Sequence, residues 1–179
     1  TYREGLDEGR VVSPLSLGMI GTPYTVDWTP YAEADWDAPI RSGLPPEQLS
    51  ELAKAICRVP DAHKMHPRVA RIMADRQRMA EGDAPMDWGF AETMAYASIL
   101  AEGNHIRLTG QDSGRGTFFH RHAVLHSQNG EQPFVPLSHV AEDQASFKVT
   151  DSLLSEEAVL GFEYGYATAA PETLVIWEA

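Results

Sequence analysis

The chain has 179 residues, 43% of them hydrophobic and 22% charged, which is typical of a globular protein rather than a disordered one. Its net charge of −12 argues against a nucleic-acid-binding protein, which needs a basic face, and against adsorption to an anionic membrane surface. No apolar run approaches the roughly 20 residues of a membrane-spanning helix. The single cysteine, Cys57, cannot form an internal disulfide, which favours a reducing compartment such as the cytoplasm.

The first part of the chain predicts an arm followed by two helices. Residues 1 to about 45 are rich in Pro, Gly, Trp and Tyr and lack a steady hydrophobic period, so we expect an extended arm without its own core. The segment 45–60 predicts an amphipathic helix, with apolar residues at i, i+3, i+4 and i+7: Leu49, Leu52, Ala53 and Ile56. A second helix is predicted over 66–83, basic and exposed on one side and closed by Gly82.

From residue 86 onward, helix and strand patterns alternate. A third helix is predicted over 86–104, with Asp87 as its N-cap and Gly103 at its C-terminal end. The further predicted elements are a strand at 105–110, a strand at 147–152, a helix at 153–169 and a strand at 173–179. This order predicts an α/β fold with a parallel sheet and helices on its faces, in which catalytic loops leave the carboxyl ends of the strands.

The loop "GQDSGRGTFFHRHAVLHSQ", residues 110–128, carries the first candidate chemistry. His120 and His122 would share one face of a strand, and His122 and His126 one face of a helix, so no single element presents all three. Because no Cys or HExxH pattern accompanies them, we expect no metal site here. The "SGRG" stretch with Arg115 could cradle an anion, but an ordinary loop with a surface arginine explains these residues equally well.

The predicted helix 153–169 is apolar nearly all round, which indicates that it is buried. A carboxylate on a buried helix loses water, its pKa rises, and it can share a proton near neutrality. Periodicity alone does not choose between Glu156 and Glu163 for such a role. Alternatively, the glutamates are helix-start charges, with Asp151 and Ser152 as the cap, and for Glu157 we favour this interpretation.

Long segments of the chain resemble one family. "HPRVARI", "DWGFAE", "RLTGQDSGRGTFFHRHAVLHSQ", "FVPLSHV" and "DSLLSEEAVLGFEYGYATAAPETLVIWEA" are similar to the decarboxylating component of 2-oxoglutarate dehydrogenase. The resemblance begins near residue 28 and is densest over 105–179. It implies an arm and helical connector at 1–83 and the first half of a pyrimidine-binding domain at 84–179. We therefore expect the chain, which begins without methionine and ends within a strand pattern, to be a piece of a longer enzyme.

The resemblance also implies a set of site residues. Glu156, followed by Glu157 and the small Ala158, matches the catalytic glutamate that binds the N1′ nitrogen of thiamine diphosphate. Gln111 and Asp112 lie where related enzymes place an acidic residue near the cofactor, and the glutamine departs from that pattern. Arg115, His120 and His122 are implied to line the substrate site or a subunit interface. The loop is implied to bind no metal of its own, because Mg²⁺ would be held by an upstream domain.

The activity implied by this resemblance is oxidative decarboxylation of 2-oxoglutarate, with transfer of the succinyl group to a lipoyl carrier in the citric acid cycle. The implied partners are a second copy in a homodimer and dihydrolipoyl succinyltransferase with its lipoyl domain. The implied location is the bacterial cytoplasm, or alternatively the mitochondrial matrix. Two alternatives remain open: a 2-oxoadipate dehydrogenase, and a catalytically inert interaction module formed by this segment alone.

Overall fold

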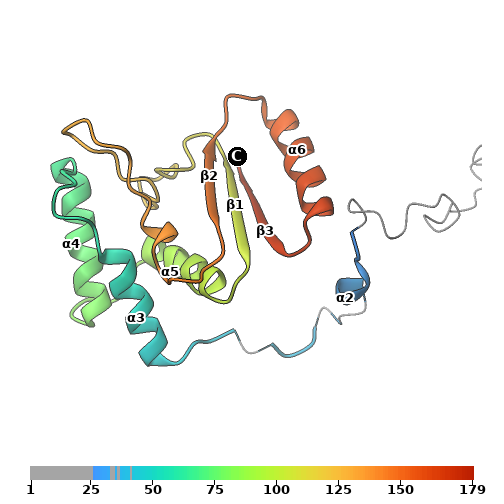
Figure 1. Ribbon diagram of the computed structural model, residues 1–179, viewed down its shortest axis with the longest axis horizontal. Coiled ribbons are helices and arrows are strands. Elements are labelled where there is room, and N and C mark those ends of the chain that lie inside the picture. Colours follow the sequence, from blue (N-terminus) through green and yellow to red (C-terminus); the bar gives the residue numbers. More distant parts are fainter. Residues whose placement is uncertain (1–25, 33–34, 36, 41) are drawn as a thin grey trace, which may run out of the picture. The chain divides into compact units, whose positions relative to one another are not determined.

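In a computed structural model of the chain, the described residues are 26–32, 35, 37–40 and 42–179 (Figure 1). The chain divides into two compact units, Thr1–Pro39 and Ile40–Ala179. Most of the predicted arm lies outside the described residues. The part that is described contains one helical turn, α2 (Thr29–Ala32), which the composition of the arm did not predict. The carboxylate of Asp27 accepts a hydrogen bond from the Thr29 amide at 2.9 Å and so begins this turn.

Helix α3 (Pro46–Cys57) confirms the first predicted helix. Pro46 occupies its first turn, where a missing N–H costs nothing. Leu52, Ala53 and Ile56 are buried as expected, whereas Leu49 is 37% exposed. Leu52, Ala53 and Ile56 belong to the same hydrophobic core as Phe90 and Ile106. This part of the predicted connector therefore packs on the α/β part of the chain. The domain boundary between residues 83 and 84 stays a prediction.

Helix α4 (Pro67–Glu81) confirms the second predicted helix and its end. Gly82 adopts a φ of 84°, in the left-handed region that glycine favours at helix ends. At the other end, the ring of His66 accepts a hydrogen bond from the Arg68 amide at 3.2 Å. The inner side of α4 buries Met73, Ala80 and, unexpectedly for a basic helix, Arg76.

Helix α5 (Trp88–Ala101) begins and ends as the sequence predicts. The carboxylate of Asp87 accepts a hydrogen bond from the Phe90 amide at 2.7 Å, and Gly103, with a φ of 88°, follows its last turn. The side chains of Phe90, Met94 and Leu100 are buried in the core. α5 is therefore the helix that closes one face of the sheet.

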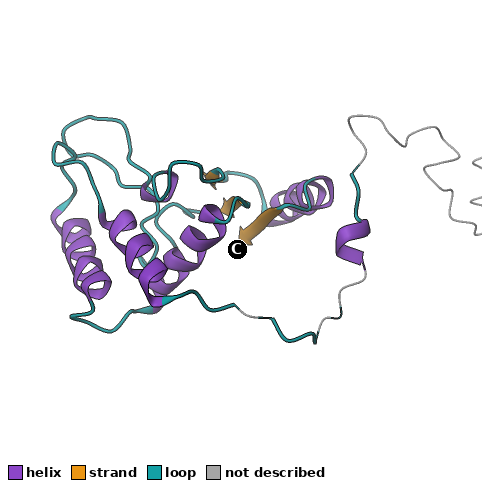
Figure 2. Cartoon of the chain, turned by 60° about the horizontal axis from the view of Figure 1, so that its bottom comes forward, coloured by secondary structure: helices purple, strands orange, loops and turns teal. Residues whose placement is uncertain are grey.

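The sheet has three strands, which are parallel as predicted: β1 (His105–Gly110), β2 (Phe147–Asp151) and β3 (Thr173–Glu178). Their order in the sheet is β2-β1-β3, which the sequence did not predict. Gly110 pairs with Asp151 on one side and Glu178 on the other, so all three strands end at one edge. Ile106 of β1 joins the α5 core, whereas the neighbouring Arg107 points to the opposite face. A second view shows the strands between helices on either side (Figure 2).

Helix α6 (Glu156–Ala169) covers the other face, next to β3, but differs from its prediction in two ways. The residue before it is Ser155, so the expectation that Asp151 and Ser152 cap it is wrong. The expectation of a buried helix is also wrong, because only Val159 and Glu163 are buried. Its exposed large apolar residues are Leu160, Phe162, Tyr164 and Tyr166. No helix in the described part of the chain is long and apolar enough to cross a membrane.

Candidate active site

A cavity of about 360 Å³ lies at the carboxyl ends of the three strands. Its lining residues come from the strand ends, from the loop after β1 and from the start of α6: Gly110, Gln111, Asp112, Asp151, Ser152, Leu153, Leu154, Glu156, Val159, Trp177, Glu178 and Ala179. We call it the strand-end cavity. Ligands of open α/β sheets bind outside the carboxyl ends of the strands.

Glu156 is the first residue of α6 and lies in the wall of the strand-end cavity. Its side chain is exposed, so the expectation that burial of the helix would desolvate it is wrong. Among the described residues, none forms a hydrogen bond or ion pair with its carboxylate. Apolar residues beside it, Leu154 and Val159, line the same wall. Glu156 thus offers a free carboxylate next to apolar surface.

Glu163, the alternative that periodicity left open, has a structural partner. Its carboxylate accepts hydrogen bonds from Nε and Nη2 of Arg107 at 2.7 and 2.8 Å. The hydrogen bonds that Arg107 donates to Glu163 raise the pKa of Arg107. The guanidinium lies 4.8 Å from the ring centre of Tyr166 and 5.3 Å from that of Phe162. The buried carboxylate of α6 therefore binds the helix to β1 and does not face the cavity.

Gln111 and Asp112 lie in the turn that leaves β1, and both line the strand-end cavity with Glu156. Asp112 has a φ of 56°, and its carbonyl accepts hydrogen bonds from the amides of Arg115 and Gly116. Its carboxylate forms an ion pair with Arg115. On the far side of the turn, the Gly114 amide donates to the Asp151 carboxylate at 3.0 Å. The predicted cofactor residues are thus brought together by a tight, well-bonded turn.

Arg115 and His122 line a second cavity, of about 480 Å³, with mostly apolar walls. The Arg115 guanidinium lies 3.9 Å from the centre of the Phe119 ring. His122 is buried, with a φ of 44°, and its pKa is lowered by burial first and by the charge of Arg76 second. A neutral imidazole is therefore expected at position 122. A third cavity shares Asp112 and Asp151 with the strand-end cavity and Arg115 and His122 with the second cavity.

His120 belongs to a different cluster, so the expectation that His120 and His122 share a face is wrong. The segment that carries them is neither strand nor helix. Nε2 of His120 lies 3.5 Å from the carboxylate of Glu92 on α5, and His120 lines neither the strand-end cavity nor the second cavity. The structure therefore brings Glu156, Gln111 and Asp112 to one cavity and Arg115 with His122 to another, and it separates His120 from both groups.

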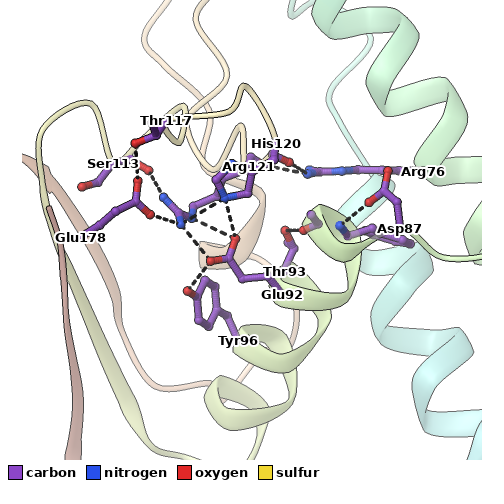
Figure 3. A network of polar contacts seen from close by, with 12 residues as sticks. Arg76, Asp87, Glu92, Thr93, Tyr96, Ser113, Thr117, His120, Arg121 and Glu178 are labelled. Carbon is purple, nitrogen blue, oxygen red and sulfur yellow. Dashed lines mark hydrogen bonds and ion pairs between the residues drawn. The ribbon is translucent and has the colours of Figure 1, made fainter.

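Arg121, for which the sequence predicted no role, lies at the centre of this cluster (Figure 3). Its guanidinium bonds to carboxylates of Glu92 and Glu178, which are 29 and 57 residues away in the chain. No local pattern signals contacts of that separation. Glu92, His120 and Glu178 bring ligand atoms within 4.8 Å of one another, a spacing that could hold a metal ion. Arg121 already supplies the positive charge between the two carboxylates.

Residues 84–179 match the family model described as "Transketolase, pyrimidine binding domain". The chain is 52% identical to the 2-oxoglutarate dehydrogenase E1 component of Haemophilus influenzae, 49% to that of Coxiella burnetii and 47% to that of Cupriavidus necator. Each match covers 99% of this chain and 19% of the relative, so the chain spans about a fifth of the length of these relatives. With its three-stranded parallel sheet and flanking helices, the chain belongs to the transketolase pyrimidine-binding domain family.

Proposed function

We propose that the chain is part of a thiamine diphosphate-dependent dehydrogenase that decarboxylates 2-oxoglutarate and passes the succinyl group to a lipoyl carrier. The observation that carries this proposal is the free carboxylate of Glu156 beside apolar walls in the strand-end cavity. The names of relatives that align with 99% of the chain support the same reaction. 2-Oxoadipate is the alternative substrate, and no observation favours it.

The lining of the strand-end cavity fits a pyrimidine ring. Leu153, Leu154 and Val159 offer apolar surface for the faces of the ring, and Glu156 offers a carboxylate for a ring nitrogen. When bound, thiamine diphosphate supplies a carbon nucleophile and accepts the electron pair that decarboxylation releases. Mg²⁺, which its diphosphate requires, would be bound by residues outside this chain.

We assign Glu156 the role of holding a proton at the N1′ nitrogen of the pyrimidine, which tunes the basicity of the ring. Gln111 and Asp112, which line the same cavity, would also contact the cofactor. Arg115 and His122 would line the path of the substrate, because the second cavity combines a cationic side chain with apolar walls. For His120, we propose a structural role, either beside Glu92 and Arg121 or at a subunit interface, rather than contact with substrate.

We also propose that the enzyme acts as a homodimer and delivers its product to the lipoyl domain of a dihydrolipoyl succinyltransferase. Leu160 and Tyr164, four residues apart, leave α6 with an exposed apolar side that a second polypeptide could cover. Because Glu156 begins this same helix, a contact there would complete the site. By this proposal, the chain alone is inactive.

The first experiment measures reduction of an artificial electron acceptor by the full-length enzyme with 2-oxoglutarate, thiamine diphosphate and Mg²⁺. Glu156→Gln should lower kcat by about 10²-fold or more, the scale of general acid–base catalysis. The matched control is Glu157→Gln, an exposed neighbour on the same helix turn, which should keep wild-type activity. Equal activity of Glu156→Gln and wild type would remove Glu156 from the mechanism. If the enzyme turns over 2-oxoadipate and not 2-oxoglutarate, the proposed substrate is wrong and 2-oxoadipate replaces it.

A further inference from the structure

Arg121 makes the densest set of polar contacts next to the strand-end cavity, although it does not line the cavity itself (Figure 3). Its side chain is 2% exposed. Nε and Nη2 donate to the two carboxylate oxygens of Glu92 at 3.1 and 2.8 Å. Nη1 donates to the carbonyl of Ser113 at 2.9 Å, and Nη2 also donates to the carboxylate of Glu178. One guanidinium therefore serves three different segments.

Two of these three segments form walls of the strand-end cavity. Ser113 directly follows Gln111 and Asp112 in the turn after β1. Glu178 is the last residue of β3 and lines the cavity itself. The third segment, Glu92, lies on α5, which is anchored in the core by Phe90. Arg121 thus connects two walls of the cavity, the turn after β1 and the end of β3, to a helix that is anchored in the hydrophobic core.

The backbone that carries Arg121 is itself fixed by a second buried arginine. Nη2 of Arg76 on α4 donates to the carbonyls of His120 and Arg121 at 2.8 and 2.7 Å (Figure 3). Against α5, the His120 carbonyl lies so close to Gly89 that a Cβ there would be 2.5 Å from its oxygen. The backbone of Arg121 is therefore held in place, and its guanidinium offers Ser113 and Glu178 hydrogen bonds at fixed positions.

Charge explains why arginine suits this place better than a neutral residue. Two carboxylates, of Glu92 and Glu178, meet at one guanidinium, whose planar fork can bond to both and to a carbonyl at once. Burial raises the pKa of Glu178, but the hydrogen bond and charge of Arg121, together with the Thr117 backbone and His120, lower it, and the net shift is downward. Without the guanidinium, the two carboxylates would repel each other and the end of β3 would lose its anchor.

We propose that Arg121 is a positioning residue, which holds the 111–116 turn and the end of β3 as fixed walls of the strand-end cavity facing Glu156. Its effect on turnover rests on the proposed function, whereas its hold on the turn does not. Lysine would keep the charge but cannot reach Ser113 and both carboxylates together.

The test compares Arg121→Met and Arg121→Lys with Arg71→Met, an exposed arginine on α4, in the full-length protein. Amide hydrogen exchange is followed by mass spectrometry in a peptide covering 110–117 and in one covering α3. Exchange in 110–117 should rise by about tenfold or more in Arg121→Met with α3 unchanged, which is local opening. Arg121→Lys should lie between Arg121→Met and wild type.

A second measurement is the affinity for thiamine diphosphate with Mg²⁺, by calorimetry. We expect Arg121→Met to weaken it by about tenfold, and kcat to fall by up to 10²-fold, as misplaced groups do in active sites. Exchange or affinity equal to that of Arg71→Met would overturn the inference, as would an equal rise of exchange in α3, which indicates a general loss of stability. If the wild type does not turn over 2-oxoglutarate, the proposed function fails, while exchange and affinity still decide the role of Arg121.

Discussion

The two faces of the sheet are closed in different ways. On one face, α5 places Phe90, Ala97 and Leu100 entirely out of solvent. On the other face, α6 buries one apolar residue, Val159, and one carboxylate, Glu163. The first attachment is a continuous hydrophobic core, whereas the second combines one buried valine with contacts of Arg107 to Glu163 and to the rings of Phe162 and Tyr166.

This difference matters because α6 contributes Glu156 and Val159 to the lining of the strand-end cavity, whereas α5 packs against β1 and contributes none of the lining residues. Burial of apolar surface is additive and non-directional, so α5 is held firmly along its length. An ion pair fixes one point of α6 and leaves its first turn, with Glu156, open to the cavity. The rigid face thus provides the frame, and the open face provides the chemical group.

The largest effect should come from breaking the hydrophobic face. Phe90→Ala leaves a cavity in the core and should reduce the free energy of unfolding by about 4 kcal/mol. Trp88→Ala, two residues earlier on the same helix, is the control, because its side chain is 92% exposed. The free energy of unfolding of Trp88→Ala should stay within about 0.5 kcal/mol of the wild-type value. Urea unfolding followed by far-ultraviolet circular dichroism measures both, and similar losses for the two variants would contradict a core centred on Phe90.

The charged face should give a smaller loss. Glu163→Gln preserves the shape of the side chain but removes the charge that Arg107 faces, and should cost about 2 kcal/mol. Glu157→Gln, an exposed residue on the same helix, is the matched control and should leave the unfolding curve unchanged. If Glu163→Gln were as stable as wild type, α6 would be held by its apolar contacts instead.

The smallest effect comes from Glu178 at the end of β3, whose carboxylate bonds to Arg121, and it depends on pH. Because the pKa of Glu178 is lowered from its ordinary 4.5, its carboxylate stabilises the folded state above the unfolded pKa. The stability gap between wild type and Glu178→Gln should be about 1.5 kcal/mol at neutral pH. It should disappear as the pH falls below about 4.5 through the lowered folded pKa. Unfolding curves from pH 7 to 3 measure this gap, and a gap that persists at pH 3 would rule out the ion pair as its source.

The elements of the rigid face could be predicted from the sequence because their signals are local. Asp87 and Gly103 mark the ends of α5, and the glycine at 82 ends α4. The strands at 105–110, 147–151 and 173–178 are short segments, and their alternation with helix patterns predicts that they are parallel.

The remaining features could not be predicted, since they depend on contacts between distant residues. The apolar sequence of α6 indicates burial, but in this chain much of that apolar surface is exposed. The role of Glu163 depends on Arg107, 56 residues earlier, and that of Arg121 on Glu92 and Glu178. Hydrophobic periodicity carries no information about such pairs.

Gly110, at the point where the three strand ends meet, has a consequence for how this sequence can evolve. A Cβ at this position would overlap the carbonyl oxygen of Glu178 and come within 2.9 Å of the Ser113 hydroxyl. Because the first obstacle is a main-chain atom, no change of side chain at position 178 can remove it. Every other amino acid at position 110 would therefore need a shift of the β3 backbone, which no single compensating substitution provides. This position should remain glycine in any lineage that keeps the cavity.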